Sequence, residues 1–516
     1  MGNADSHGAR DYHDRTKHSQ ASVRTNPHSL DWATMPIPYK IYETLEPLAL
    51  PTDWQAATMS ALEAIASPGA PPTAPATPDL AALARLLRLA GGVVRKVVYA
   101  GGREQHYRAA ACTGALYHID LYVVCGPLAG LAAGVYHFGT HDFALRRLRA
   151  GDHRGAVVEA TAAEPAIVDA PVVLVAASTF WRNAWKYQAR TYRHCFWDSG
   201  TILANLLAVS AATEMPARVV LGFVDQTINV LLGLDVAREG TLALVAIGHD
   251  PDGHAAPPPS AEPLSLPTRP LSTSEIDYPA IRSAYVASSL ASTEEVRAWR
   301  SGPTPVPASP TPVGGTVALC PTSRLPVETI DALIQRRGSA RQFAPASISL
   351  EQLSTILERA TRGAPTDCLE SGAPHLSDLY LIVNAVDDLA PGTYVLDRHR
   401  SVLERLGAGD FRRAAGYLGL GQELPADASV DIYLLTNLDA VLARYGNRGY
   451  RVAQLDAAII GGKIYLAAYA LGLGATGLTF FDDDVTDFFS PHAAGKSVMF
   501  LMAVGLGRKQ RRRVTP

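Results

Sequence analysis

The sequence repeats itself. The segment GALYHIDLYVV, which begins at Gly114, is similar to GAPHLSDLYLI, which begins at Gly372, an offset of 258 residues. The same offset then keeps the two segments in register without a gap as far as Asp198 and Asp456. The later segments LVAIG and LMAVG also match, with one residue deleted in between. Such a chain is a tandem duplication, so its two halves are expected to share one fold.

Each half shows the same expected order of elements. A strand, a glycine turn and a second strand come first, followed by a short helix, a strand, a long helix and a final strand. The long helix follows Asp198 or Asp456, and it is apolar on every face, which predicts that it is buried all round. Strands and helices mixed in this way predict an α+β fold. Two homologous halves on one chain are expected to pack as an intramolecular pseudo-dimer.

The composition between the halves predicts a linker. Residues 251–320 are rich in Pro, Ala and Ser, with one helix expected near Glu275–Arg300. Half one is therefore placed at 1–250 and half two at 321–516.

The overall composition excludes several classes of protein. The 516 residues exceed one ordinary core, and 47% hydrophobic with 18% charged residues is typical of a globular chain. Lys plus Arg is 46 and Asp plus Glu is 49, a net charge of −3 that argues against a nucleic-acid binder. There is no uninterrupted apolar run of membrane-spanning length, and the polar N-terminus lacks the apolar core of a signal peptide. The 5 cysteines show no CxxC pair or metal-ligand spacing, so we expect no metal site and a cytoplasmic location.

Half two carries a candidate phosphate clamp. In QRRGSARQF, two guanidiniums, Arg337 and Arg341, flank the hydroxyl of Ser339, a set that can bind a phosphate. The helix LAALARLL of half one aligns with LEQLSTIL of half two at an offset of 270. Half one then has Ser67, Gly69 and Pro71 at the three clamp positions. The clamp is therefore absent from half one.

Half one instead keeps a longer loop. It has 12 more residues than half two before the repeat segment, and then the loop AACTGALY. The additional residues are mostly basic or aromatic and include Arg95, Lys96, Arg103, His106 and Arg108. Each half thus lacks what the other retains, which predicts one composite site per chain.

These motifs together resemble the nitroreductase superfamily, and within it the SagB/ThcOx group of flavin-dependent dehydrogenases. YHDRTKHS (12–19) is similar to that group's Tyr-His-x-x-Thr-Lys opening, and RRGSARQF to its FMN-phosphate motif. RAAACTGALY (108–117) resembles its Arg-x-x-Pro-Ser-x-Gly-Ala loop, with Ala111 in place of Pro and Cys112 in place of Ser. WKYQARTYR and DSGTILANLLAVSAATEM resemble its Lys-Tyr segment and the helix that follows.

The resemblance implies two tandem nitroreductase-like domains with FMN bound between them. The expected FMN-binding groups from half two are Arg337, Ser339, Arg341, the main chain near Gly477, and a basic residue at Arg508 or Lys509. Those expected from half one are Arg108, Cys112 and Gly114. We expect Cys112 to be a small residue facing the flavin rather than a redox thiol.

The catalytic pair is expected in half one. Half one keeps Lys186-Tyr187, whereas half two has Arg444-Tyr445, and arginine cannot accept a proton at neutral pH. Either Lys186 or Tyr187 is the expected base. The resemblance implies oxidation of thiazoline or oxazoline rings to thiazoles or oxazoles, in a ribosomally made peptide or a synthetase-bound chain, with O₂ as final acceptor. Implied partners are the modified precursor peptide and cyclodehydratase components of the same antibiotic-type pathway.

Two other functions stay open at this stage. An NAD(P)H-dependent nitro- or quinone-type reductase would use the same flavin with an open face. A non-catalytic scaffold lobe would have lost the flavin site, and the missing clamp of half one shows that such loss does occur in this chain.

Overall fold

The computed structural model describes residues 2–25, 27–69, 74–99, 102, 104–253, 255, 257, 259, 262–305, 314–369 and 375–508. Four residues named above, Pro71, Arg103, Gly372 and Lys509, lie outside these ranges.

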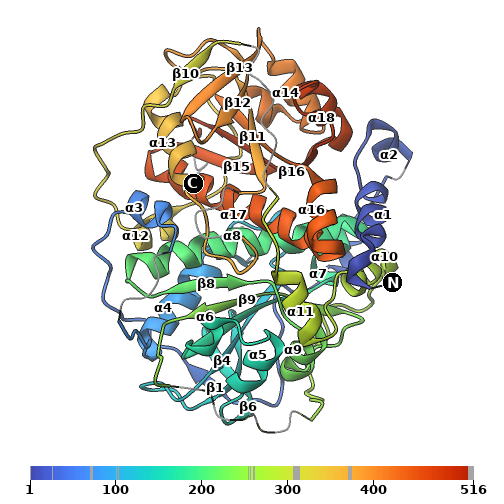
Figure 1. The fold of residues 1–516 in the computed structure, drawn as a ribbon, viewed down its shortest axis with the longest axis vertical. Coiled ribbons are helices and arrows are strands. Elements are labelled where there is room, and N and C mark those ends of the chain that lie inside the picture. The colour runs from blue at the N-terminus through green and yellow to red at the C-terminus, as the bar shows by residue number, and fades with distance from the viewer. Residues whose placement is uncertain are drawn as a thin grey trace.

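Each half is built on one seven-stranded antiparallel sheet (Figure 1). The order in half one is β1-β6-β5-β4-β7-β9-β8, and the order in half two is β10-β13-β12-β11-β14-β16-β15. The strands of half one are β1 (Pro47–Ala49), β4 (Ile119–Cys125), β5 (Gly134–Gly139), β6 (Ala144–Ala150), β7 (Val172–Thr179), β8 (Ala217–Val220) and β9 (Glu239–Ile247). Those of half two are β10 (Thr316–Ala318), β11 (Ser377–Val383), β12 (Gly392–Asp397), β13 (Val402–Ala408), β14 (Val430–Thr436), β15 (Gly474–Leu478) and β16 (Ser497–Gly505). The identical orders confirm the duplicated α+β fold.

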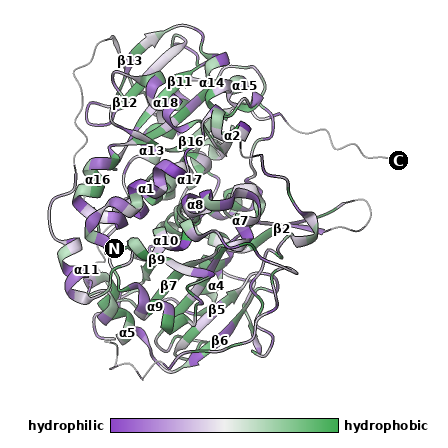
Figure 2. Cartoon of the chain, turned by 90° about the vertical axis from the view of Figure 1, so that its right-hand side faces the viewer, coloured by the Kyte–Doolittle hydropathy of each residue, from purple (hydrophilic) through white to green (hydrophobic). Residues whose placement is uncertain are grey.

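Helices flank the sheets and fill the space between them. The helices numbered up to half one's last strand are α1 (His7–Arg15), α2 (Gln20–Thr25), α3 (Ala61–Ala66), α4 (Leu80–Gly91), α5 (Arg154–Ala160), α6 (Pro165–Val168), α7 (Trp181–Tyr187), α8 (Thr191–Ala212) and α9 (Asp225–Leu232). The later helices are α10 (Pro279–Ala287), α11 (Thr293–Arg300), α12 (Ile330–Arg336), α13 (Leu350–Ala360), α14 (Arg412–Leu418), α15 (Glu423–Asp427), α16 (Leu438–Tyr445), α17 (Gly449–Ala470) and α18 (Asp482–Phe489). A separate hairpin, β2 (Val93–Val98) and β3 (Glu104–Arg108), projects from half one (Figure 2).

The structure adds elements that the sequence pattern missed. Strands β6 and β8, helices α7 and α9, and their counterparts in half two were not expected. The linker holds two helices, α10 and α11, in place of the one expected near Glu275–Arg300. The long helix also starts earlier, at Thr191 or Gly449, so Asp198 and Asp456 lie inside it.

The two long helices, α8 and α17, cross between the sheets. A Cβ on Gly200 would overlap Ala458, and a Cβ on Gly462 would overlap Ala204. Each of these contacts joins a residue to its own counterpart 258 positions away, so the crossing lies on the pseudo-two-fold axis. Residues 181–212 are apolar and long enough to cross a membrane, but 89% of their most apolar window is buried inside the protein. The burial expected for the long helices is confirmed.

Buried ion pairs join the halves on both sides of the crossing. Asp482 of half two contacts Arg190 and Arg193 of half one at 3.0 and 2.5 Å. In the equivalent place, Asp225 of half one lies 2.7 Å from both Arg448 and Arg451 of half two. The two halves therefore depend on each other to neutralise their buried charges.

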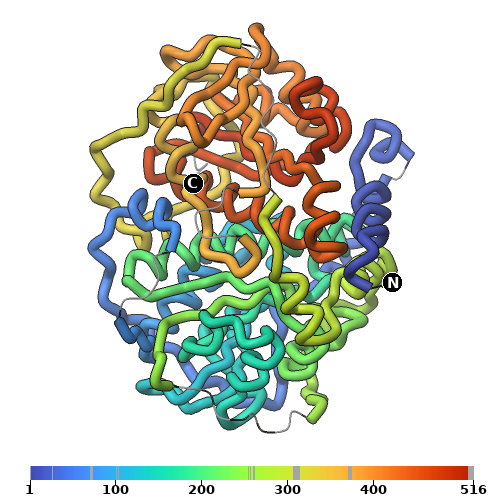
Figure 3. Tube along the Cα trace, viewed as in Figure 1, coloured from blue at the N-terminus to red at the C-terminus, as the bar shows by residue number. Residues whose placement is uncertain are grey.

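A short helix packs on each of these charge clusters. The arginine Arg193 donates to the carbonyl of His13 on α1 (2.7 Å) and to the hydroxyl of Thr16 (3.1 Å). On the other side, Arg451 donates to Tyr285 O on α10 (2.9 Å) and to Ser288 Oγ (2.8 Å). The Tyr-His-x-x-Thr-Lys segment thus anchors the N-terminal helix beside half two, where the first part of the trace lies in Figure 3.

Candidate active site between the halves

A cavity of about 310 Å³ lies between the halves on one side of the helix crossing. Half one contributes residues 111–114, the end of α7 and the first part of α8. Half two contributes Ser339, Arg341, the loop before α15, and residues 476–479 of β15 and the segment after it. A flat apolar ring can fit such a space because Trp197, Tyr465 and Phe500 line it beside the main chain of β15.

A second cavity of about 470 Å³ opens from the first. The two share Ala111, Cys112, Ser339 and Arg341 in their walls. Its lining is strongly basic, with Arg95, Arg108, Arg336, Arg337, Arg341 and Arg508. None of its described lining residues is acidic, so this cavity favours an anion.

Apart from Lys509, which lies outside the described residues, the site candidates named from the sequence all line one of these cavities. Lys186, Tyr187, Cys112, Gly114, Ser339, Arg341 and Gly477 line the first cavity. Arg108, Arg337 and Arg508 line the second. The structure therefore brings together residues from positions 108 to 508 of the chain at one place.

The loop of half one is held by a buried carboxylate. Asp198 on α8 accepts hydrogen bonds from the Thr113 amide (2.9 Å), the Cys112 thiol (2.9 Å) and His118 Nε2 (3.0 Å). Burial, together with Asp198, raises the pKa of Cys112 well above its usual range, so this side chain is a neutral thiol. A neutral thiol that donates to Asp198 fits a positional role better than a redox role.

The same loop has an unusual backbone. Gly114 has φ 62°, and Ala115 (φ 55°) and Tyr117 (φ 50°) also lie in the left-handed region. A Cβ on Gly114 would lie 2.9 Å from the hydroxyl of Tyr187. Left-handed conformations at alanine and tyrosine cost about 1 kcal/mol or more each, and such strain is concentrated at functional sites.

The clamp residues have different surroundings. The guanidinium of Arg337 is buried and donates to Ala109 O of half one (2.7 Å) and to Gly338 O (2.7 Å). By contrast, Arg341 and Arg508 are exposed at the second cavity, and within the described residues neither forms an ion pair. Thus Arg337 ties the clamp to the half-one loop, whereas Arg341 and Arg508 keep their charge available.

A tyrosine connects the hydroxyl of the clamp to β15. The hydroxyls of Ser339 and Tyr465 are 3.3 Å apart, and the Gly477 amide donates to Tyr465 Oη (2.6 Å). Tyr465 was not identified from the sequence, because it lies in no motif and only its position on α17 brings it to the cavity. Arg95 and Tyr107 also line the second cavity and were not named as site candidates, although Arg95 is among the additional basic residues of half one.

The Lys-Tyr pair forms one wall of the first cavity. Lys186 is exposed, with Nζ 5.3 Å from the ring centroid of Tyr187. Burial, with the nearby Asp198 and Cys112, raises the pKa of Tyr187, so its hydroxyl stays protonated at neutral pH. The ring of His194 packs edge-on against Tyr187 with centroids 4.5 Å apart and fixes its position.

The equivalent place on the other side of the helix crossing is closed by the chain itself. The amide of Val219 on β8 donates to Pro365 O (2.8 Å), and the amide of Asp367 donates to Val219 O (3.0 Å). The carboxylate of Asp367 also accepts from the amides of Leu221 (2.7 Å) and Gly222 (2.9 Å). The loop of half two thus lies along the edge of β8. The equivalent edge of β15 in half two faces the open cavity.

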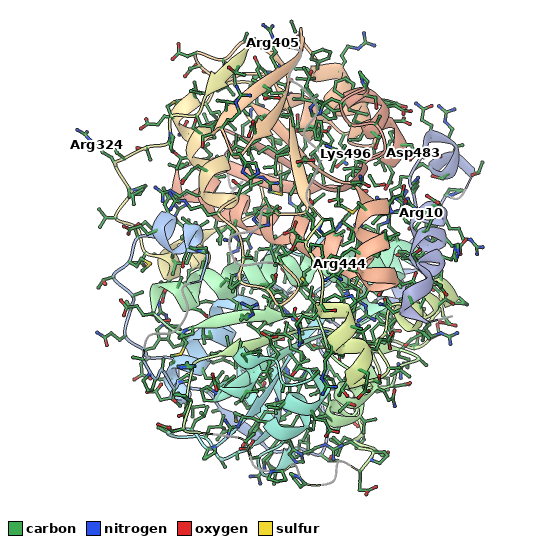
Figure 4. All side chains as sticks on the ribbon, in the orientation of Figure 1. Arg10, Arg324, Arg405, Arg444, Asp483 and Lys496 are labelled. Atoms are coloured by element: carbon green, nitrogen blue, oxygen red, sulfur yellow. The ribbon has the colours of Figure 1, made fainter. Side chains whose placement is uncertain are left out.

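The linker fills the rest of that place. Trp299 at the end of α11 donates from Nε1 to Tyr445 O (3.1 Å), and the two rings are 5.4 Å apart. Beside them, Arg444 lies where the halves meet (Figure 4). It donates to main-chain carbonyls of Trp299 (2.9 Å), Arg300 (3.2 Å), Gly302 (2.9 Å) and Pro303 (3.0 Å).

The residues of the open cavities fit FMN. The first cavity has aromatic side chains and a glycine-containing strand for a flat ring system, and the second has arginines with free charge for a phosphate. A side chain at position 114 would fill the space between Gly114 and the Tyr187 hydroxyl, and glycine leaves that space free.

Comparison with known proteins agrees with this geometry. Residues 334–506 match the Nitroreductase family. Half two is a nitroreductase-family domain. A nitroreductase of Methanocaldococcus jannaschii is 26% identical over 166 residues, which cover 30% of this chain and 81% of that protein. A crystal structure of a nitroreductase from Anabaena variabilis superposes with a TM-score of 0.77 at 24% identity, covering 97% of this chain and 99% of that one. The superposition extends the nitroreductase-like fold to half one.

Proposed function

We propose that this chain is an FMN-dependent azoline dehydrogenase, which oxidises thiazoline or oxazoline rings of a modified peptide to thiazoles or oxazoles. The observation that carries this proposal is the position of Lys186 and Tyr187 on the wall of the first cavity between the halves. The resemblance of the motifs to the SagB/ThcOx group supports the same reaction. A cytoplasmic enzyme that works with the ring-forming enzymes of its pathway fits this proposal.

The residues divide into a cofactor-holding set and a reacting pair. Arg341 and Arg508 would hold the phosphate, Ser339 and the Gly477 main chain would line the ring system, and Arg337 would position the clamp. Bound FMN would supply the two-electron acceptor, which O₂ would regenerate with formation of hydrogen peroxide.

The protein's own task is to remove a proton. Aromatisation of an azoline releases one proton from the carbon beside the carbonyl and one hydride from the neighbouring ring carbon. Lys186 is the proposed proton acceptor of the pair, because the Tyr187 hydroxyl already carries its own proton. The Tyr187 hydroxyl would donate a hydrogen bond to the substrate.

The experiment is a turnover assay with a synthetic thiazoline-containing peptide in air. The proposal predicts a mass loss of two hydrogen atoms per ring, with hydrogen peroxide formed and no nicotinamide required. Tyr187→Phe should keep the FMN and lower kcat, and Tyr417→Phe, at an exposed position outside the cavity, is its control. Rapid bleaching of the flavin by NADPH, with no oxidation of the peptide, would instead favour the reductase. A protein that binds no flavin would favour the scaffold.

A further inference from the structure

The closed site contains a bound peptide segment, which is the linker. Arg300 places Nε 3.3 Å from the carboxylate of Glu164 and donates to Thr161 O at 3.0 Å. The repeat offset of 258 places Gln422 and Gly419 at the equivalent positions of half two. Since Gln422 lines the open cavity, the linker occupies the counterpart of that cavity.

The linker is held through its main chain and one flat ring. Arg444 donates to four successive or near-successive carbonyls, and the Trp299 ring packs against Tyr445 at a tilt of 48°. A side chain with several N–H donors is well suited to collect the carbonyls left free where a helix or turn ends. Binding of the linker therefore depends on a cationic side chain followed by a tyrosine, Arg444 and Tyr445.

The open cavity presents the same two groups, and no part of the chain that the structure describes lies across them as the linker does across Arg444 and Tyr445. Lys186 and Tyr187 are the repeat counterparts of Arg444 and Tyr445. Within the described residues Lys186 forms no hydrogen bond or ion pair, and it is exposed at the cavity. Its N–H donors, three in the ammonium form and two in the neutral amine, are thus available to carbonyl oxygens.

We propose that the open cavity binds a peptide as the closed site binds the linker. Main-chain carbonyls of the substrate accept hydrogen bonds from Lys186, and the substrate's flat ring faces Tyr187. Lys186 then has two tasks, because an amine that donates to a carbonyl still has a lone pair for the adjacent proton. That this ring is an azoline rests on the proposed function; the main-chain binding mode does not.

Lysine and arginine variants separate the two tasks. Lys186→Arg keeps donors for carbonyls but cannot accept a proton, so it should bind peptide and lose turnover. Lys186→Met removes both. Lys17→Met is the matched control, since Lys17 is a partly exposed lysine outside the cavity that pairs with Asp14 and Asp483.

The probe is a fluorescently labelled synthetic peptide, RAWRSGPTP, with the sequence of residues 297–305. Its Kd for the FMN-loaded protein is measured by fluorescence anisotropy, and a scrambled peptide serves as reference. Perturbation of the flavin absorbance on peptide binding reports whether the peptide enters this cavity.

The proposal predicts that RAWRSGPTP binds at least about tenfold more tightly than the scrambled peptide and perturbs the flavin spectrum. Lys186→Met should weaken its Kd by about tenfold or more, the effect of losing a charged donor, whereas Lys186→Arg and Lys17→Met should keep it within about threefold. Equal binding of both peptides, or a Kd unchanged in Lys186→Met, would overturn the proposal. If RAWRSGPTP binds as predicted and a thiazoline peptide is still not oxidised, the binding mode stands and the proposed reaction fails.

Discussion

Val219 and Gly477 occupy the same position on the edge strands of the two sheets, opposite Val245 and Met502, but their surroundings differ. The Val219 amide donates to the main chain of Pro365, whereas the Gly477 amide donates to the Tyr465 hydroxyl at the open cavity. The duplication thus produced two equivalent places between the halves, and the chain has closed one with its own loop and linker.

The charge of Arg341 should determine the affinity for FMN. Arg341→Ala removes an exposed cation from the basic cavity without breaking any described ion pair or buried contact. Loss of one charged hydrogen-bond donor to phosphate should weaken the Kd for FMN by roughly 10- to 100-fold. The Kd can be measured by quenching of flavin fluorescence. Arg324→Ala removes an arginine that lines neither cavity and lies at the left edge of the molecule in Figure 4, so it should leave the Kd unchanged; equal losses would contradict the assignment.

Gly114 should tolerate no side chain. Gly114→Ala places a Cβ 2.9 Å from the Tyr187 hydroxyl at a residue with φ 62°. We expect a loss of about 1–2 kcal/mol in the free energy of unfolding, and weaker FMN binding because Tyr187 must move. Thermal unfolding with and without FMN measures both. Gly315→Ala is the control because a Cβ there meets nothing within 4 Å, and an equal effect of the two changes would argue against this account.

Acid should weaken the contact between the halves at Asp482. Burial alone would raise the pKa of this carboxyl, but Arg190 and Arg193 hold it well below its usual range. The stabilisation is therefore complete above the unfolded pKa of about 3.9 and is lost as the pH falls through the lower folded pKa. Asp482→Asn should cost about 3 kcal/mol at pH 7 and should remove this part of the acid sensitivity.

Urea unfolding at pH 7, 5, 4 and 3 tests that prediction. Asp483→Asn is the control, because this neighbouring carboxylate is 69% exposed and pairs only with Lys17 in the described structure. A difference between wild type and Asp482→Asn that stays constant from pH 7 to pH 3 would show that the ionised carboxylate is not the stabilising group.

Arg444 should hold the linker without influencing the cofactor. Arg444→Met removes the donors to four carbonyls, so the free energy of unfolding should fall by about 2–3 kcal/mol and the linker should be cleaved faster in limited proteolysis. The FMN content should not change, because Ser67 and Gly69 cannot replace the clamp in half one. A second equivalent of FMN in this variant would mean that the linker alone closes the second place.

The repeat predicted most of the fold because both copies preserve the same buried positions. The long helices and the strands that pair with them were found from apolar pattern and register. Helix α7 was missed because it is short and follows β7 directly, and β8 because its four residues are only partly apolar. Elements as short as these are determined by packing against the sheet rather than by their own sequence.

The candidate site could be predicted where a motif has its own chemistry. Arg337, Ser339, Arg341, Lys186 and Tyr187 all reach the cavities, as the two-sided loss of motifs indicated. The different task of Arg337, which bonds Ala109 O, could not be predicted because it depends on how closely the halves approach.

The closure of the second place was also beyond the sequence. The missing clamp of half one predicted a single site. The sequence around Trp299 and Pro365, however, does not indicate that these residues fill the second place between the halves. That result depends on contacts between segments far apart in the chain, which only the assembled fold defines.

The ratio of flavin to protein tests the central claim most directly. The purified protein is saturated with FMN, freed of excess ligand and denatured, and the released flavin is quantified by absorbance against protein concentration. One composite site predicts about one FMN per chain, and none in an Arg337→Ala/Arg341→Ala double variant. Two FMN per chain, or none in the wild type after saturation, would contradict the account.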